Sequence, residues 1–148
     1  MIVAFGSDIK TAVTDAIERW LRERGHGVVL EGVLATGDDS WPRAGRGVAV
    51  AVAEGRAQSG IVCCWTGTGV SIAANKVSGV RAALCGDAPT AAGAREWNDA
   101  NVLALSLRAT SEAMAIEILE AWFAGRPTGD PKYRAMIESV EGAIQGPR

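Results

Sequence analysis

A glycine-rich turn directly after an apolar run carries the residue types best suited to chemistry. The run is Ser59–Cys64, and the turn that follows, WTGTGVS, contains Gly67 and Gly69. These glycines allow consecutive backbone N–H groups to point at one place, where they would bind an anion or a developing negative charge. Lys76 lies too far beyond the glycines for the phosphate loop of nucleotide hydrolases. Taken alone, the turn is equally compatible with a purely structural role.

Two adjacent cysteines, Cys63 and Cys64, close the apolar run. Side chains alternate along a strand, so one thiol is expected to point inward and that of Cys64 to be exposed beside the turn. A thiol next to converging N–H groups is expected to have a lowered pKa, which suits a base or a nucleophile. Buried cysteines are common core residues, and this interpretation is favoured for Cys63 and Cys85. The position of Cys64 favours chemistry.

Three other polar residues lie near the ends of predicted strands. Asp8 follows the first apolar run, where it could contact a bound hydroxyl group or cap the next helix. Arg108 follows the fifth run and could bind an anion or simply be exposed. His26, the only histidine, follows Gly25 at the opposite end of the predicted sheet and is expected at the surface. The predicted site therefore has no histidine for acid–base chemistry.

Apolar runs typical of strands alternate with helical patterns along the chain, which predicts one α/β domain over residues 1–148. Strands are expected at residues 2–5, 27–33, 59–64, 79–85 and 101–106. Helices are expected at residues 13–21, 47–54, 70–76, 88–97 and 110–123, and a last helix follows the pair Asp130 and Pro131. Continuous apolar strands predict a parallel sheet with helices on both faces, and ligands bind such sheets beyond the carboxyl ends of the strands.

The last helix follows the final sheet unit and carries an apolar stripe of its own. The stripe consists of Tyr133, Met136, Ile137, Val140 and Ile144. An apolar face with no further element to cover it predicts packing on a partner subunit.

Composition restricts the classes of protein that the chain can belong to. Apolar residues make up 48% of its 148 residues and charged residues 22%, with a net charge of -2. The near-neutral charge gives no sign of nucleic-acid or membrane-surface binding, and no apolar run is long enough to span a membrane. The first residues lack an export signal, and three cysteines give no disulfide framework. We therefore expect a cytoplasmic protein with reduced thiols.

Three segments resemble the ribose-5-phosphate isomerase B family, which also includes galactose-6-phosphate isomerase subunits. They are GSD at residues 6–8, CWTGTGVSIAANKVSGVRAALC at residues 64–85 and AREWNDANVLALSLR at residues 94–108. The resemblance covers nearly the whole chain. It implies a Rossmann-like three-layer domain, a homodimer or tetramer with active sites shared between subunits, and no metal or organic cofactor. The implied reaction interconverts aldose and ketose phosphates through a cis-enediol intermediate.

The resemblance also implies roles for the residues of the glycine-rich turn. Cys64 matches the base that moves a proton between C1 and C2. The turn itself matches the loop whose backbone N–H groups hold the enediolate; its residues here are Thr66, Gly67, Thr68, Gly69 and Val70. Val70 stands where some family members carry a catalytic glutamate, so the cysteine version is the one implied.

Other roles implied by the resemblance lie outside this turn. Asp8 matches a sugar-contacting aspartate. Asn98 and Arg108 match residues that the neighbouring subunit donates to sugar hydroxyls and to phosphate. Lys132 and Arg134 are a loose match, with different spacing, to a basic pair that binds the phosphate.

Four departures from the family pattern fall at positions of the implied site. Ile9 replaces a phosphate-contacting histidine, and Trp97 replaces the histidine that opens the sugar ring. Trp65 replaces a glycine after the base, and Trp41 replaces the tyrosine of a Tyr-Pro pair. We expect the three tryptophans to contact substrate and, with the loss of the histidine at Ile9, to change its identity; tryptophans that merely pack are the alternative.

Three functions are compatible with these departures. The first is isomerisation of a sugar phosphate that is already open-chain, such as a tetrose phosphate. The second is isomerisation of an unphosphorylated or aromatic-bearing substrate. The third is a non-catalytic binding or subunit-type homologue, in which an unlike partner supplies the missing histidine.

Overall fold

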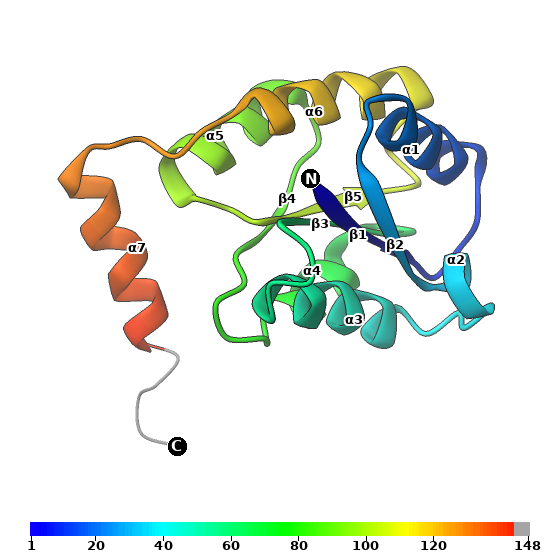
Figure 1. The fold of residues 1–148 in the computed structure, drawn as a ribbon, viewed down its shortest axis with the longest axis horizontal. Coiled ribbons are helices and arrows are strands. Elements are labelled where there is room, and N and C mark those ends of the chain that lie inside the picture. Colours follow the sequence, from blue (N-terminus) through cyan, green and yellow to red (C-terminus); the bar gives the residue numbers. More distant parts are fainter. Residues whose placement is uncertain (144–148) are drawn as a thin grey trace.

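The computed structural model describes residues 1–143, in which five short strands form one parallel sheet (Figure 1). The strands are β1 (Ile2–Ser7), β2 (Gly27–Gly32), β3 (Ser59–Cys64), β4 (Ala82–Leu84) and β5 (Val102–Ser106), in the order β2-β1-β3-β5-β4. From β1 the chain first adds β2 on one side and then β3 on the other. The switch point of the sheet is therefore between β1 and β3, where ligands of such folds bind.

Helices cover both faces of the sheet, as predicted. α1 (Ala12–Glu23), α5 (Ala88–Asn98) and α6 (Glu112–Ala124) lie on one face, and α3 (Trp41–Ala53) and α4 (Thr68–Ala74) lie on the other (Figure 1). The short α2 (Val33–Thr36) follows β2 at the edge of the sheet.

Alternate residues of the central strands β1, β3 and β5 fill two separate cores. The core on the α1, α5 and α6 side includes Phe5, Ile61, Leu103, Leu119 and Trp122. The core on the α3 and α4 side includes Ala4, Val48, Val62, Val70 and Ala104. All of these side chains are at most 1% exposed, and each large one contributes roughly 1.5–3 kcal/mol of burial free energy. Strands that are buried on both faces explain the continuous apolar runs in the sequence.

The starts of the helices differ in one respect that matters for function. α1, α3, α5 and α6 begin with a side-chain oxygen cap, supplied by Thr11, Ser40, Asp87 and Ser111. α4 follows Gly67, whose φ of 75° is left-handed, and has no side-chain cap. The first N–H groups of α4 therefore have no local side-chain partner.

Most predicted elements are present; two differ clearly in extent, and one helix was not predicted. α3 begins at Trp41 rather than at residue 47, because Ser40 caps it and Pro42 fits its first turn. β4 has only three residues. The backbone before it is bound by the side-chain amide of Asn101, which accepts from the Arg81 N–H at 2.8 Å and donates to the Gly79 carbonyl at 2.8 Å. α2 was not predicted.

The last helix, α7 (Pro131–Ala143), extends away from the rest of the domain (Figure 1). The predicted cap is present, because Asp130 accepts a hydrogen bond from the Lys132 N–H at 2.9 Å. Glu141 forms an ion pair with Arg81, at 2.5 Å. The apolar stripe is largely uncovered within the chain; Met136 is 52% and Val140 57% exposed. Its packing on a partner subunit stays a prediction, and Ile144 lies outside the described residues.

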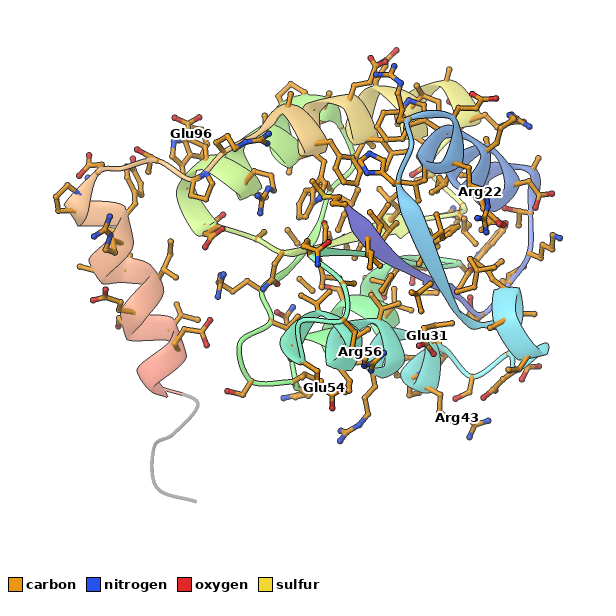
Figure 2. All side chains as sticks on the ribbon, in the orientation of Figure 1. Arg22, Glu31, Arg43, Glu54, Arg56 and Glu96 are labelled. Atoms are coloured by element: carbon orange, nitrogen blue, oxygen red, sulfur yellow. The ribbon has the colours of Figure 1, made fainter. Side chains whose placement is uncertain are left out.

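Charged side chains of both signs project from the outer surfaces of the helices (Figure 2). Some form local ion pairs, such as Arg22 with Glu18 at 2.7 Å and Arg56 with Glu54 at 2.9 Å. Exposed pairs of this kind contribute little to stability. Across residues 1–143, no helix has both the length and the apolar character that a membrane span requires.

Candidate active site

The carboxyl ends of β1, β3 and β5 bring the predicted catalytic residues to one edge of the sheet. Ser7 of β1 pairs with Cys63 of β3, so the next residues, Asp8 and Cys64, end adjacent strands at the switch point. Cys64 in turn pairs with Ser106, the last residue of β5. The edge is thus built by strand register, which is fixed by the two-sided burial of the strands.

The two adjacent cysteines lie on opposite faces of β3, as alternation predicts. Cys63 belongs to the core under α1, α5 and α6, and burial raises the pKa of its thiol. Cys64 faces α3 and α4. The expectation that Cys64 is exposed is wrong: it is 5% exposed, because α4 folds over the end of β3 and buries Val70 against the same core. Its thiol therefore lies just beneath the turn.

Cys85, like Cys63, is a core residue, and this was expected for both. Cys85 is 1% exposed and belongs to the same core as Cys63. Burial, with a smaller contribution from Asp87, raises the pKa of the Cys85 thiol to about 11. Such a thiol stays protonated and unreactive near pH 7.

The turn after β3 presents free backbone N–H groups, which we call the amide cup and define as the N–H groups of residues 66–70. Within the described part of the chain, none of them donates a hydrogen bond; the next N–H, of Ser71, donates to the Gly67 carbonyl at 3.2 Å. The carbonyls of Cys64 and Trp65 accept from the N–H groups of Leu107 and Arg108, at 3.0 and 2.9 Å. The turn is therefore held on its carbonyl side while its donors stay available.

Two glycines of the amide cup are required for different reasons. Gly67 has a left-handed backbone, and a Cβ there would lie 2.6 Å from Leu84 Cδ1 and 2.8 Å from the Leu105 carbonyl carbon. Gly69 has no such backbone requirement; a Cβ there would lie 2.9 Å from Cε3 of Trp41. The contacts of Leu84 and Leu105 had no signal in the sequence beyond their places near strand ends.

Hydroxyl groups line the amide cup without occupying it. The Oγ1 atoms of Thr66 and Thr68 are 2.8 Å apart and form a hydrogen bond with each other. Ser106 Oγ donates to the Trp65 carbonyl at 3.0 Å. Thr66 and Thr68 are both exposed, so a bound molecule could reach them.

Asp8 is a partly buried carboxylate in an unfavourable environment. Its Oδ1 is buried and has no hydrogen-bond partner among the described residues. Burial raises the pKa of the Asp8 carboxyl, and the nearby carboxylate of Asp39 raises it further, although its own backbone N–H lowers it. Asp8 is not the cap of α1, because Thr11 holds that position. The proximity of Asp39 was missed; its only signal was the Asp-Asp pair before Ser40.

Apolar side chains are exposed at the same edge. Trp41 contacts Gly69 and is 43% exposed, Trp65 is 56% exposed, and Ile9 is 38% exposed. Large apolar side chains in such number on one small surface are typical of a binding site.

The remaining predicted site residues lie elsewhere in the chain. Trp97 and Asn98 end α5, just before β5 begins, whereas Cys64 pairs with the last residue of β5. The length of β5, about 13 Å at about 3.3 Å per residue, separates the two groups. Lys132 and Arg134 are on α7. One chain therefore does not bring these residues to Cys64.

Trp97 and Asn98 instead line a groove of about 620 Å³ between α7 and the rest of the domain. Tyr133, Met136, Ile137 and Val140 form its other wall. Arg108 differs from these residues, because its backbone is bonded to Trp65 at the edge that holds Cys64.

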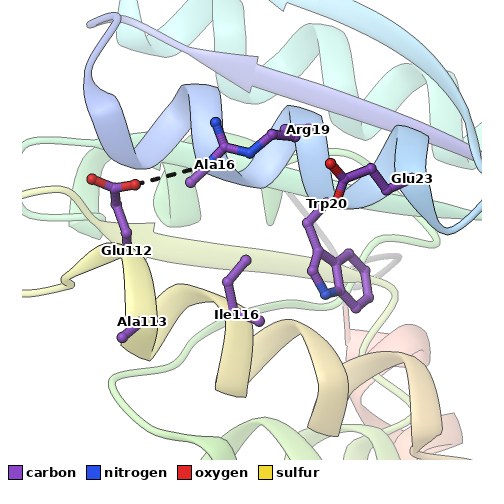
Figure 3. A pocket seen from close by; sticks show the side chains of 7 residues that line it. All are labelled: Ala16, Arg19, Trp20, Glu23, Glu112, Ala113 and Ile116. Carbon is purple, nitrogen blue, oxygen red and sulfur yellow. Dashed lines mark ion pairs between the residues drawn. The ribbon is translucent and has the colours of Figure 1, made fainter.

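A separate hollow between α1 and α6 is not part of this site (Figure 3). Arg19 and Glu112 form an ion pair across it at 3.9 Å, and Trp20 lines it. Close by, the ring of His26 stacks on Phe123 with centroids 4.8 Å apart. His26 is partly exposed, so it lies at the surface as expected while its ring packs on Phe123. Partial burial lowers the pKa of its imidazole.

Metal chemistry has no evident ligand set in the part of the chain that the structure covers. Within residues 1–143, no three side chains of the His, Cys, Asp or Glu types are grouped in a way that could hold an ion.

The fold and this edge define a Rossmann-like α/β domain with a cysteine beside free amides at the switch point. The chain belongs to the Ribose/Galactose Isomerase family, whose model matches residues 3–139. Ribose-5-phosphate isomerase B of Escherichia coli is 35% identical over 144 residues, 97% of this chain and 96% of that protein. D-erythrulose-4-phosphate isomerase of Pectobacterium atrosepticum is 39% identical over 116 residues, 78% of this chain and 74% of that protein.

A solved structure gives the same result. Ribose-5-phosphate isomerase B of Clostridium thermocellum superposes with a TM-score of 0.90 at 34% identity, covering 98% of both chains. The resemblance noted in the sequence is confirmed, and the protein is a sugar-phosphate isomerase related to ribose-5-phosphate isomerase B.

The environment of Asp8 predicts that Asp8→Asn stabilises the fold. Because the folded pKa of Asp8 is raised, ionising it costs free energy that a neutral amide avoids. The gain is complete above the folded pKa and is lost as pH falls towards the unfolded value of about 3.9. Thermal unfolding of both proteins between pH 4 and 8 measures it. Asp39→Asn should give a smaller gain, and a lower unfolding midpoint for Asp8→Asn at pH 7 would contradict the prediction.

Proposed function

We propose that this enzyme interconverts an aldose phosphate and a ketose phosphate through a cis-enediol, with preference for a substrate that is already open-chain. The observation that carries the proposal is the amide cup beside Cys64. Its donors are free, its carbonyl side is fixed, and the base candidate ends the preceding strand. Preorganised donors of this kind stabilise a developing oxyanion, and one donor contributes roughly 3–4 kcal/mol.

The reaction needs no oxidant or reductant. The Cys64 thiolate removes the proton from C2 of the aldose, and the C1 carbonyl oxygen takes up the charge at the amide cup. The proton of the O2 hydroxyl moves to O1, with the Thr66 hydroxyl, which is bonded to that of Thr68, as the proposed relay. The thiol then returns its proton to C1, which gives the ketose. The proton lost from C2 is returned at C1, and the proton lost from O2 is returned at O1.

Asp8 binds a substrate hydroxyl in this proposal. Its buried Oδ1 has no partner among residues 1–143 and can accept a hydrogen bond. A hydroxyl donor would also relieve the cost of burying the carboxylate.

The preference for an open-chain substrate follows from what the site lacks. The chain has one histidine, His26, which is stacked on Phe123 in the layer opposite to Cys64. No imidazole is therefore available to open a sugar ring. A tetrose 4-phosphate cannot close a furanose ring, because the hydroxyl required carries the phosphate. The relative from Pectobacterium atrosepticum, a D-erythrulose-4-phosphate isomerase, supports a substrate of this length.

The complete site is proposed to form between two chains of a homodimer or tetramer. Trp97 and Asn98 lie at the far end of β5 from their own Cys64, beside the uncovered apolar stripe of α7. A partner that covers this stripe would receive Asn98 for sugar hydroxyls, with Lys132 and Arg134 near the phosphate. Arg108 would bind the phosphate from the edge of the sheet.

A second candidate is isomerisation of an unphosphorylated or aromatic-bearing substrate. The exposed Ile9, Trp41 and Trp65 favour it, because they add apolar surface at the edge of the sheet that holds the cup. A non-catalytic binding or subunit-type role is the third candidate, and it requires that Cys64 move no proton.

A substrate panel tests the proposed preference. Aldose–ketose exchange should be fastest with tetrose 4-phosphates and at least about tenfold slower with ribose 5-phosphate, since ring opening is not catalysed. Coupled assays with tetrose, pentose and hexose phosphates and their unphosphorylated forms measure kcat/KM. A clear preference for ribose 5-phosphate would exclude the open-chain preference. Preference for free sugars, with no inhibition by simple sugar phosphates, would favour the second candidate.

Replacement of the base gives a second test. Cys64→Ser should lower kcat by about 10²–10⁴-fold, because a hydroxyl is a much weaker base than a thiolate. Exchange of the C2 proton with deuterated solvent, followed by NMR, measures this step directly. Cys63→Ala is the matched control, since that thiol faces the other core. Retained exchange in Cys64→Ser would place the base elsewhere, and absence of exchange in the wild type would favour the third candidate.

Mixed oligomers test whether two chains share the site. Cys64→Ser and Asn98→Ala should each be inactive alone, but a co-refolded mixture should regain about a quarter of wild-type activity. Half of the dimers would be mixed, and one of their two sites would be intact. The activity of the mixture relative to each variant measures the effect. No recovery, together with proven subunit exchange, would place the whole site in one chain.

A further inference from the structure

Trp41 forms a wall of the amide cup. It is the first residue of α3, and its indole lies against Gly69. A Cβ on Gly69 would lie 2.9 Å from Cε3, 3.0 Å from Cδ2 and 3.4 Å from Cζ3 of that indole. Because Gly69 lacks a positive φ, the indole is what excludes a side chain there. The same indole is 43% exposed, so it is also accessible to a bound molecule.

Hydrogen bonds from neighbouring residues connect the two sides of the turn that leads into Trp41. The Asp38 carboxylate accepts two hydrogen bonds from the Arg43 guanidinium, at 2.5 and 2.8 Å. The same carboxylate accepts from the Ser40 N–H at 3.0 Å. These hydrogen bonds, the Arg43 bonds first, lower the pKa of the Asp38 carboxyl to about 2. Ser40 caps the helix and Pro42 restricts its first turn.

α3 and α4 also pack closely enough to keep this wall fixed relative to the cup. Gly45 of α3 lies over α4, where a Cβ would be 2.9 Å from the Val70 carbonyl oxygen and 3.1 Å from the Ala73 Cβ. The glycine allows this close approach of the two backbones. Trp41 and the amide cup are thus parts of one packed unit, and the indole has no room to withdraw towards α4.

We propose that Trp41 limits the length of the substrate that the amide cup accepts. This inference rests on the proposed function. With the C1 and C2 oxygens at the cup, the indole beside Gly69 fills space that the far end of a longer carbon chain would need. A pocket wall discriminates one additional carbon group by about 10–200-fold. The wall and the lack of a ring-opening histidine would both favour short substrates, but for separate physical reasons.

The contact with Gly69 suggests a second possible role for Trp41, which is to shield the Gly69 N–H, and this role can be distinguished from a limit on substrate length. An indole that only shields the Gly69 N–H from water would strengthen oxyanion binding for every substrate equally. A wall that limits length changes the ratio of rates between substrates. The ratio of kcat/KM for a pentose phosphate to that for a tetrose phosphate is therefore the decisive quantity.

The experiment compares the wild type with Trp41→Ala, Trp41→Leu and the control Ile72→Ala. Ile72 is 59% exposed on α4 and has no part in the site. Trp41→Ala should raise the pentose-to-tetrose ratio by at least about tenfold, and Trp41→Leu, which keeps more of the packing, should raise it less. Ile72→Ala should leave the ratio within twofold of wild type. If the wild type isomerises the tetrose phosphate but both Trp41 variants leave the ratio unchanged, the inference is overturned while the proposed function stands.

A double-mutant cycle tests the contact without using activity. Gly69→Ala should lower the unfolding midpoint in the wild-type background, because its Cβ meets the indole, and should lower it less beside Trp41→Ala. Additive effects would overturn the wall geometry. If the wild type isomerised no sugar phosphate, the proposed function would fail, whereas the cycle would still report on the contact.

Discussion

The proposed chemistry of this protein depends on backbone donors that the fold leaves free. The helices α1, α3, α5 and α6 each satisfy one of their first N–H groups with a side-chain oxygen, an interaction that contributes about 1 kcal/mol. α4 forgoes it: Gly67 turns the chain, the Thr66 and Thr68 hydroxyls bond to each other, and the carbonyls of Cys64 and Trp65 are fixed by the segment after β5. Donors held in this way need no reorganisation when charge develops on a substrate oxygen, which is the main advantage of a preorganised site.

The sheet decides which side chains meet these donors. β1 and β3 are neighbours at the switch point, so Asp8 and Cys64 end side by side although 55 residues lie between them. Alternation places Cys63 in one core and Cys64 on the other face, beneath the turn. If the register of β3 shifted by one residue, the two thiols would exchange faces, and Cys63 instead of Cys64 would lie on the face of the cup. The site therefore depends on core packing, which fixes the register.

Local patterns predicted much of this arrangement because they reflect local physics. β3 has the predicted bounds, and the predicted Asp130 cap of α7 is present. Contacts between elements left no such trace. The indole of Trp41 on Gly69 and the carboxylate of Asp39 near Asp8 each join residues that are distant in sequence. The burial of Cys64 depends on how α4 packs on the sheet. The resemblance supplied the role of Cys64, but the contacts around it required the fold.

Proton transfer at carbon and opening of a sugar ring are separate chemical demands, and this chain treats them differently. The first needs a base and an oxyanion site, and the residues proposed for both, Cys64 and the amide cup, lie at the end of β3. The second needs a group that exchanges protons near pH 7, and the one imidazole is stacked on Phe123 in the other layer. Indoles at positions 41, 65 and 97 cannot replace it, because they do not titrate; they contribute shape and apolar surface instead. An isomerase that keeps the first capability without the second gains nothing from binding a closed ring. A wall such as Trp41 beside the cup would then exclude only sugars that the enzyme could not isomerise efficiently in any case.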